Sequence, residues 1–571
     1  QRLNWMALAY GQSPEIRRHI RETYPAWWML LVVIALVGLG LYICFKRLLG
    51  RQANAPGTER PHWAAATQTV LLATLGVIAC RGGLGREPLS RDEANYTRNN
   101  LVSQLTLNNF VTATDACKTV VGDFLNDYEE EIDKHDLPDL EVATAVASEM
   151  FYSPSDIPSG SGLNPMWRRT QTGRPRRQWN VVVILMEGLA GKPVGALGHS
   201  PSHTPNFDAL SRQGLYFDRM YAVGARTSRG VSGTLCGYPD LGGPSILTRK
   251  RALGRFLTLP QVFRRRGYHT MFIYGGDADF DNMRAFLTSG SDRAVVAPGG
   301  VDEIIQQDQM GVKPDIWGVP DEYVFAKAHE RFVAMGDRPF FSVILTVSNH
   351  EPHHVPAGRC ALLPGRDEET AFLNAYRYAD WALGDFLRKA EEAPYFENTL
   401  FVLVADHGRR MDQRLILDIP AYRVPCLFFG PVLEEPIQPR TVSTVCSQTD
   451  LPVTLLSMLG GTFEHCFLGR NVLEVPPGDG FALLHEGDHL GFVRGNRAVV
   501  SRPDGGPVFF ETDGPVLKPL AGSIAAGADR LRLNREMLSL YRMALYLYSE
   551  QAFSRPPMPL ATSMDGIQPG R

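Results

Sequence analysis

Residues 180–189 read NVVVILMEGL, an apolar run that passes directly into a carboxylate and a glycine. Short runs of branched apolar residues are typical of a strand that is buried on both faces of a sheet. Two later stretches have the same form: FFSVILTVSNH at 340–350 and LFVLVADHG at 400–408. Because parallel strands present their carboxyl ends at one edge of a sheet, the three runs predict strands whose polar ends meet at such an edge.

Around these runs, short apolar segments alternate with amphipathic ones. This alternation is typical of the α/β class, a mostly parallel sheet flanked by helices on both faces. We expect strands at 181–186, 269–274, 341–347, 400–404 and 425–429. We expect helices at 206–213, 259–266, 321–335, 369–389 and 450–459.

Two uncharged stretches near the start of the chain predict transmembrane helices that precede the α/β domain. Residues 26–45 contain no charge, with two tryptophans at one end and Lys46 and Arg47 after the other, as is typical of a bilayer span. Residues 63–80 form a second candidate. The loop between them is rich in Lys and Arg, which favours a cytoplasmic position for the loop. The rest of the chain is then expected on the periplasmic side of the cell membrane. Because the chain opens at Gln1, we expect earlier residues to precede it.

The chain divides into four expected regions. They are a membrane region at 1–82, an extracytoplasmic helical connector and linker at 83–178, an α/β domain at 179–475 and a C-terminal subdomain at 476–571. In the connector we expect helices at 94–111 and 138–150. In the subdomain we expect short strands at 491–500 and 507–511 and a helix at 531–553.

The composition excludes some classes of protein. Lys and Arg number 58 against 61 Asp and Glu, a formal net charge of −3, so no nucleic-acid partner is expected. Eight cysteines in 571 residues are too few for a disulfide scaffold. The six that lie outside the predicted spans allow fifteen pairings, and their spacing selects none. Cys426, inside the apolar VPCLFFG, is expected to be a buried free thiol.

The polar strand ends supply ligands for one divalent metal ion. Glu187, Asp406 and His407 offer oxygen and imidazole donors, which suit Mn²⁺, Zn²⁺ or Mg²⁺. We expect Thr227 as the fourth ligand. It lies in GARTSRG at 224–230, which is expected to open a helix.

Thr227 is also the candidate nucleophile. A helix N-terminus favours phosphate oxygens, and a hydroxyl bound to a cation loses its proton more easily. Arg226 and Arg229 flank it and could clamp phosphoryl oxygens. The alternative is that Thr227 is an ordinary helix cap.

Eight motifs carry a resemblance to a known family. They are NVVVILMEGL, TPNFDALSRQGLYFDRMY, GARTSRG, YGGDADFDNM, WGVPDE, SVILTVSNHEPH, FVLVADHG and SQTDLPVTLLSMLGG. In this order, the region from roughly residue 85 to 475 resembles the lipoteichoic acid synthase family of membrane phosphoglycerol transferases, in particular its Gram-negative homologues. This family belongs to the alkaline phosphatase and sulfatase superfamily.

The resemblance implies a sulfatase-like catalytic domain at 179–475 and a set of roles. Its metal ligands fall on Glu187, Thr227, Asp406 and His407, with Mn²⁺ as the first choice of ion. Thr227 is implied as the nucleophile, and His350 as the residue that contacts the substrate phosphate or protonates the leaving alkoxide. The implied reaction moves phosphoglycerol from phosphatidylglycerol, through phospho-Thr227, to an envelope glycan or polymer acceptor.

One motif departs from the family. Phe280, Asp281, Asn282 and Met283 stand where lipoteichoic acid synthases of Gram-positive bacteria have Phe-Trp-Asn-Arg, which leaves the headgroup and the acceptor open. Asp277, Asp281 and Asn282 are expected in the substrate pocket, with a surface loop as the alternative. Trp317 in WGVPDE is expected to pack, with a place in the pocket wall as the alternative.

Other functions remain as alternatives. A phosphoethanolamine transferase would also use a threonine. A sulfatase would need Cys or Ser in C/S-x-P-x-R, which the sequence from Thr227 lacks, and a phosphatase would let water resolve the intermediate. A non-catalytic scaffold is the non-enzyme alternative, although each predicted ligand position holds a competent residue.

Overall fold

The computed structural model describes residues 135–553, apart from short segments at 160–163, 190–192, 199, 290–299, 316, 351–352, 366, 409–416, 434–439, 503–504, 513–516, 520–523 and 551. The described residues fall in one compact unit. The predicted membrane helices at 26–45 and 63–80 and the connector helix at 94–111 lie outside them. Within the described part of the chain, no helix combines the length and the apolar character needed to cross a bilayer.

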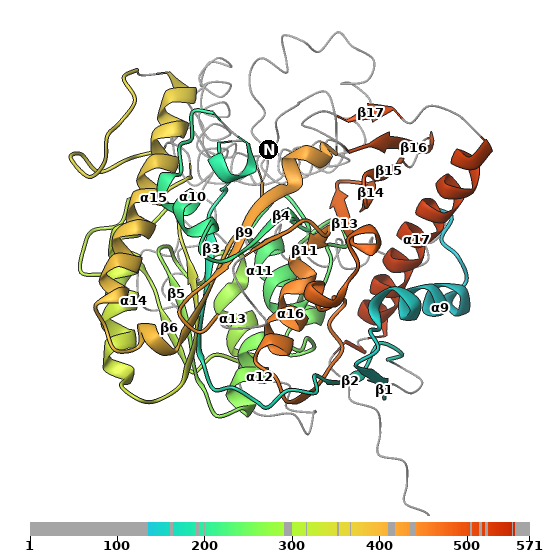
Figure 1. Cartoon of the computed structure of the whole chain (residues 1–571), viewed down its shortest axis with the longest axis horizontal. Helices are drawn as coiled ribbons and strands as arrows, with labels where there is room; N and C mark the ends of the chain where they lie inside the picture. Colours follow the sequence, from blue (N-terminus) through green and yellow to red (C-terminus); the bar gives the residue numbers. More distant parts are fainter. Residues whose placement is uncertain are drawn as a thin grey trace, which may run out of the picture. The chain divides into compact units, whose positions relative to one another are not determined.

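A nine-stranded mixed sheet forms the centre of the molecule (Figure 1). Its order is β10-β4-β9-β8-β3-β7-β5-β6, and β11 also pairs with β4. Strand β9 runs antiparallel to β4 and β8, while the other described pairs are parallel, so the predicted mostly parallel sheet is confirmed with one exception. The bounds are β3 Asn180–Met186, β4 Leu215–Tyr221, β5 His269–Tyr274, β6 Glu303–Ile305, β7 Phe340–Leu345, β8 Thr399–Ala405, β9 Arg423–Phe429, β10 Arg440–Val442 and β11 Cys446–Ser447.

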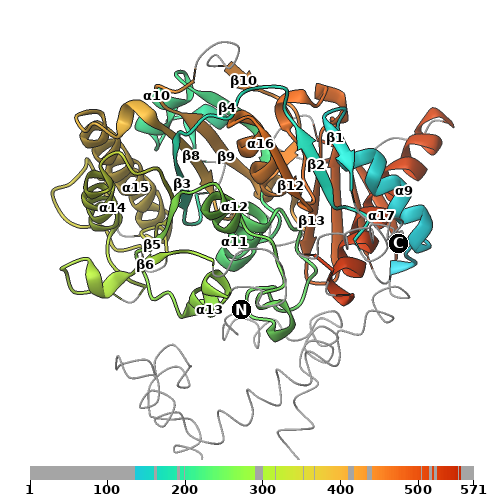
Figure 2. The same cartoon turned by 90° about the horizontal axis from the view of Figure 1, so that it is seen from below.

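Helices cover both faces of this sheet. Figures 1 and 2 show α10, α14 and α15 grouped on one side and α11, α12, α13 and α16 on the other. All five predicted helices of this domain are present with small shifts at their ends. The bounds are α10 Pro205–Ser211, α11 Thr227–Cys236, α12 Leu259–Arg265, α13 Met283–Thr288, α14 Asp321–Met335, α15 Glu368–Glu391 and α16 Leu451–Met458.

Two smaller sheets and two helices complete the described structure. Strands β1, β2 and β12 form a three-stranded sheet, and β13 to β17 form an antiparallel one. The predicted stretch 491–500 spans two strands because Gly495, with φ of +56°, turns the chain between them. The bounds are α9 Leu140–Phe151, β1 Asp156–Pro158, β2 Arg168–Gln171, β12 Thr462–His465, β13 Phe481–Glu486, β14 His489–Arg494, β15 Arg497–Arg502, β16 Gly505–Glu511, β17 Lys518–Pro519 and α17 Ile524–Ser549.

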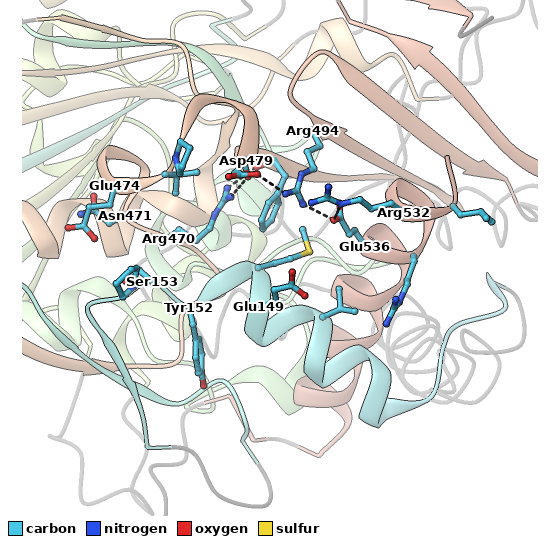
Figure 3. Close-up of a pocket in the computed structure, with 18 of the residues that line it drawn as sticks. Glu149, Tyr152, Ser153, Arg470, Asn471, Glu474, Asp479, Arg494, Arg532 and Glu536 are labelled. Carbon is cyan, nitrogen blue, oxygen red and sulfur yellow. Dashed lines mark hydrogen bonds and ion pairs between the residues drawn. The ribbon is translucent and has the colours of Figure 1, made fainter. Parts of the chain in front are cut away.

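A cavity of about 820 Å³ lies between α9, α17 and the chain around β13 and β14 (Figure 3). Its wall is rich in charged groups that pair with one another. Arg494 contacts Asp479 at 3.0 Å and Glu536 at 2.7 Å, and Arg532 also contacts Glu536, at 2.8 Å. None of the predicted site residues lines this cavity, so the candidate chemistry lies elsewhere.

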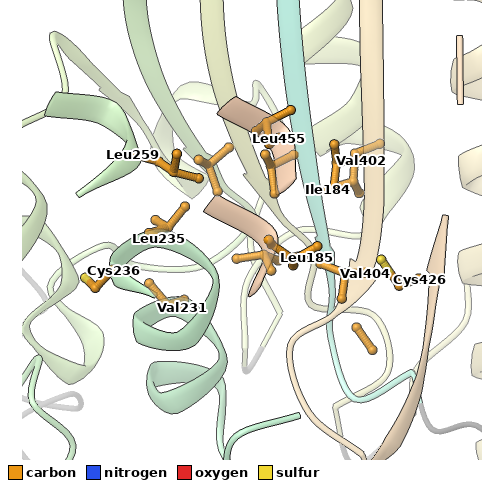
Figure 4. Packing of buried hydrophobic residues seen from close by; sticks show 14 of the residues in the cluster. Ile184, Leu185, Val231, Leu235, Cys236, Leu259, Val402, Val404, Cys426 and Leu455 are labelled. Carbon is orange, nitrogen blue, oxygen red and sulfur yellow. The ribbon is translucent and has the colours of Figure 1, made fainter. Parts of the chain in front are cut away.

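The core packs α11, α12 and α16 against the middle of the central sheet (Figure 4). Ile184 and Leu185 of β3 are fully buried, as is Leu235 of α11. Each such side chain contributes about 1.5–3 kcal/mol by leaving water. Cys426 is likewise fully buried and is a free thiol, as predicted.

Candidate functional site

The register of three central strands brings the predicted polar residues to one edge of the sheet. Met186 of β3 pairs with Ala405 of β8, and Leu185 pairs with Leu345 of β7. The residues that follow each strand are therefore neighbours. The Asn349 amide donates a hydrogen bond to the Glu187 carbonyl at 2.9 Å.

Thr227 faces Glu187 from the first turn of α11. Its Oγ1 donates a hydrogen bond to Glu187 Oε2 at 3.0 Å, and its side chain is buried. The N-cap position belongs to Arg226, and no side chain caps the helix. The alternative of an ordinary threonine cap is therefore wrong, because the hydroxyl is directed at a carboxylate.

Two features hold the start of α11 against the strand edge. A Cβ on Gly230 would lie 2.0 Å from the Asp406 carbonyl oxygen, so only glycine permits this approach. Gln448 accepts a hydrogen bond from the Val223 amide at 3.0 Å. Its own amide donates to the carbonyls of Ala405 and Asp406 at 2.8 and 2.7 Å. Gln448 thus joins the segment before Thr227 to β8.

Glu187, Asp406 and His407 form a possible metal site. Their ligand atoms all lie within 4.8 Å of one another. Asp406 Oδ1 accepts hydrogen bonds from the amides of Gly188 and His407, whereas Oδ2 is buried without a hydrogen-bond partner. His407 Nδ1 donates to the Gly408 carbonyl at 2.9 Å, which leaves Nε2 free to coordinate. The donor set and the unpaired buried oxygen fit a divalent cation.

The electrostatics of this cluster favour added positive charge. Burial, and then the neighbouring charge of Glu187, raise the pKa of Asp406 to about 7. Burial opposes the protonation of His407, but Asp406 and Glu187 raise its pKa to about 10. Burial also opposes ionisation of Glu187, yet His350 and His407 together hold its pKa well below the usual value. Two buried carboxylates so close together repel one another unless a cation or protons lie between them.

His350 extends the cluster from the end of β7. Its Nε2 lies 3.3 Å from Glu187 Oε1. Its ring stacks on Trp317, with centroids 4.2 Å apart and an interplanar angle of 9°. Trp317 thus packs on another ring, as we expected, and the alternative also holds, because its side chain is 38% exposed and lines a pocket together with His350.

The remaining predicted residues lie in different surroundings. Arg226 is exposed beside Thr227. Arg229 is engaged elsewhere, in an ion pair with Asp240 at 2.7 Å and a hydrogen bond to the Gly243 carbonyl at 3.0 Å. A phosphoryl clamp formed by Arg229 would have to break this buried pair.

Asp277, Asp281 and Asn282 lie after β5. Asp281 and Asn282 adopt left-handed backbone angles, with φ of 47° and 62°. The Asn282 amide donates to the Leu247 carbonyl at 2.8 Å. Burial, and then the charges of Glu187, Asp281, Asp406 and Asp277, raise the pKa of Tyr274. Carboxylates of the possible metal site and of this acidic segment therefore both act on the hydroxyl of Tyr274, the last residue of β5.

Sequence reasoning missed several supporting residues. Tyr274 and Gln448 are two of them, and Asp321 is a third. Asp321 Oδ1 accepts the amides of Val347 and Ser348, both at 3.0 Å, and so fixes the segment that leads to His350. Asp321 and Gln448 both lie inside quoted motifs, WGVPDE and SQTDLP, at or just before the starts of predicted helices, and that position was the available signal.

The sulfatase family model matches residues 179–461. Among curated relatives, the lipoteichoic acid synthase-like YvgJ of Bacillus subtilis (strain 168) is 23% identical over 310 residues, 49% of this chain and 47% of YvgJ. Phosphoglycerol transferase I of Citrobacter koseri is 24% identical over 318 residues, 52% of this chain and 39% of the relative. The chain thus spans less than half of the length of each of these two relatives.

Solved structures show the same fold. An alkaline phosphatase superfamily protein from Vibrio parahaemolyticus is 29% identical, with a TM-score of 0.62 over 72% of this chain and 96% of that one. The lipoteichoic acid synthase LtaP from Listeria monocytogenes is 18% identical, with a TM-score of 0.54 over 67% and 94%. These matches confirm the resemblance and the sulfatase-like α/β fold that the motifs predicted.

Proposed function

We propose that the chain, whose residues 179–461 match the sulfatase family model, is a metal-dependent phosphoglycerol transferase. In this proposal, phosphoglycerol moves from phosphatidylglycerol to an envelope glycan or polymer acceptor through phospho-Thr227. The enzyme is anchored in the cell membrane, with its catalytic domain on the periplasmic side. The observation that supports this most strongly is the Thr227 hydroxyl, 3.0 Å from Glu187 at the N-terminus of α11 and beside Asp406 and His407.

Thr227, Glu187, Asp406 and His407 would hold one divalent ion, with Mn²⁺ first and Zn²⁺ or Mg²⁺ as alternatives. Such an ion supplies positive charge that favours the ionised hydroxyl and neutralises phosphoryl oxygens. The backbone N–H groups at the start of α11 add to that field. We assign Arg226, exposed beside Thr227, to the phosphoryl oxygens and leave Arg229 in its pair with Asp240.

The transfer takes two steps. Thr227 loses its hydroxyl proton to solvent and Oγ1 forms a bond to phosphorus, while the bond from phosphorus to the diacylglycerol oxygen breaks. His350 gives a proton to that leaving oxygen. In the second step His350 takes the proton of the acceptor hydroxyl, whose oxygen bonds to phosphorus as the bond to Thr227 breaks, and Thr227 regains a proton from solvent.

Asp277, Asp281 and Asn282 are our candidates for contact with the donor headgroup. Carboxylate and amide oxygens accept hydrogen bonds from the hydroxyls of a glycerol group. Two carboxylates in one segment also favour a second candidate function, phosphoethanolamine transfer, because they would pair with an ammonium group. Water as the acceptor would give a hydrolase of the same superfamily.

The test measures diacylglycerol release from vesicles that contain labelled phosphatidylglycerol or phosphatidylethanolamine, with and without Mn²⁺. We expect release from phosphatidylglycerol and a loss of at least about a thousandfold in Thr227→Ala, because a covalent nucleophile has no substitute. Mass spectrometry of the trapped enzyme should place the phosphoryl group on Thr227.

Thr234→Ala is the matched control, since Thr234 is buried two turns further along the same helix and should tolerate the change. Undiminished release by Thr227→Ala would exclude the covalent mechanism. Release from phosphatidylethanolamine alone would favour the second candidate.

A further inference from the structure

A pocket of about 250 Å³ lies beside the proposed catalytic histidine. Val319, Pro320, Val347, Val355 and Pro356 supply apolar surface, and Trp317 and His350 supply rings. The described residues that line it include no arginine or lysine. The wall away from His350 is therefore largely apolar, and it suits a neutral group better than an anionic phosphate or lipid headgroup.

Trp317 is the least expected part of this wall. One face of the indole lies against His350, and Phe280 meets it edge-on with centroids 6.0 Å apart at 88°. Even so, the side chain is 38% exposed. The exposed area belongs to the rest of the indole, since His350 covers one face. A large aromatic surface left open in a pocket is typical of a binding site.

His350 connects the pocket to the possible metal site formed by Glu187, Asp406 and His407. Its Nε2 lies 3.3 Å from Glu187 Oε1, and the same oxygen lies 3.4 Å from His407 Nε2. A hydroxyl held in the pocket would therefore lie near the group that moves the proton in the proposed mechanism. This places the pocket on the side of the incoming alcohol.

The size and polarity of the pocket limit the kind of ligand that it can bind. Pockets for drug-sized ligands measure about 300–1,000 Å³, so 250 Å³ suits a single small ring. The rim carries His354 and Asp315, paired at 2.5 Å and both at least half exposed, which offer donors and acceptors to hydroxyl groups. A sugar ring meets both demands, because its C–H face can lie on the negative face of an indole while its hydroxyls reach the polar rim.

We propose that this pocket is the acceptor subsite and that it binds one sugar ring against Trp317, with a ring hydroxyl directed at His350. The proposal rests on the proposed function. It makes Trp317 a residue that determines acceptor specificity, and it assigns the acceptor to neutral glycans. In the second step, the ring hydroxyl gives its proton to His350 as its oxygen replaces Thr227 on phosphorus.

A binding experiment tests this without any need for turnover. The full chain in detergent is titrated with cellotetraose, maltotetraose and glycerol, and binding is followed by saturation-transfer NMR and calorimetry. Because stacking on an indole depends little on the sugar linkage, we expect at least one tetrasaccharide to bind. Its affinity should fall at least tenfold in Trp317→Leu and be retained in Trp317→Tyr.

Trp381→Leu is the matched control. Trp381 is a half-buried tryptophan of α15 that stacks on Tyr378 and does not line the pocket, so this variant should bind like the wild type. Thermal unfolding verifies that each variant folds. The proposal is overturned if neither tetrasaccharide binds, if only glycerol binds, or if binding survives in Trp317→Leu.

Kinetics separate an acceptor subsite from a structural role. With phosphatidylglycerol and a glycan as substrates, Trp317→Leu should change how phosphoglycerol divides between the glycan and water. It should raise the KM for the glycan at least tenfold and divert phosphoglycerol to water as free glycerol phosphate. An unchanged KM for the glycan with no diversion to water, or a change in the KM for the lipid instead, would overturn the assignment. If the wild type releases no diacylglycerol while a tetrasaccharide still binds at Trp317, the proposed function fails and the sugar site stands.

Discussion

Asp406 shows how one residue of the site depends on its surroundings. Its Oδ1 is satisfied by two backbone amides, but Oδ2 is buried without a hydrogen bond and lies 3.6 Å from His407 Nε2. An unpaired buried carboxylate oxygen costs several kcal/mol. Glu187 adds like charge and raises the pKa of Asp406 further. A cation removes both penalties, so metal binding and stability should be coupled.

Mn²⁺ should therefore stabilise the folded chain. A ligand at a hundred times its Kd contributes about 2.7 kcal/mol, so chelator-treated protein should unfold at a higher temperature once Mn²⁺ is added. Asp406→Asn should abolish this shift without lowering the stability of the metal-free protein. Differential scanning fluorimetry measures both effects. Asp385→Asn, which alters a carboxylate on α15 that pairs with Arg388 and Lys389, should keep the shift, and equal shifts in all three proteins would contradict a site at Asp406.

Single residues of the site differ in how far the sequence could predict them. Glu187, Asp406 and His350 follow apolar strands, so their meeting at one edge followed from sheet geometry. Thr227 became a candidate through its helix-opening position and the family resemblance. The position of Arg229 could not be predicted, because its partner Asp240 lies in an irregular segment with no period to place it.

Helix α11 acts as the element that presents Thr227, and its approach depends on Gly230. A Cβ there would lie 2.0 Å from the backbone oxygen of Asp406, an atom fixed in β8 and its extension. Gly230→Ala should therefore push the helix start outward, lowering transfer at least about a hundredfold through misplacement of Thr227. Circular dichroism and diacylglycerol release measure folding and activity separately.

Gly233→Ala provides the comparison on the same helix. Its Cβ would meet Val223 Cγ2 at 2.9 Å, and a side-chain methyl can move where a backbone oxygen cannot. We expect a much smaller loss. Equal losses in the two variants would show that helix propensity, not the approach to Asp406, decides the effect.

The apolar runs that predict where a strand lies carry no information on the direction in which it runs. Runs such as 400–404 and 425–429 are apolar throughout, and burial on both faces requires that pattern in either direction. The antiparallel course of β9 depends on the path of the chain after β8, which residue type does not encode. Strands β6, β10 and β11, of three, three and two residues, are too short to leave a pattern.

At the scale of the whole molecule, a buried charged junction connects helix α11 to the C-terminal sheet. Arg229 of α11 pairs with Asp240, and His485 of β13 lies 3.9 Å from the same carboxylate oxygen. His485 stacks on Tyr541 of α17, whose hydroxyl donates to the Leu241 carbonyl at 3.1 Å. The C-terminal elements therefore support the segment that holds α11 in place. In this way they also help to position Thr227.

Removing Asp240 should test this junction. Asp240→Ala leaves the buried Arg229 guanidinium without its counter-charge, which costs about 3–5 kcal/mol. The double variant Asp240→Ala with Arg229→Met should recover part of that loss, because it removes the stranded charge and keeps apolar bulk. Urea unfolding gives the free energies. Glu464→Ala is the control: its pair with Arg169 is about half exposed on both sides, so it should cost less than about 1 kcal/mol. If Asp240→Ala and Arg229→Met, measured singly and together, are strictly additive, Arg229 and Asp240 act independently, and the C-terminal sheet has no electrostatic route to α11.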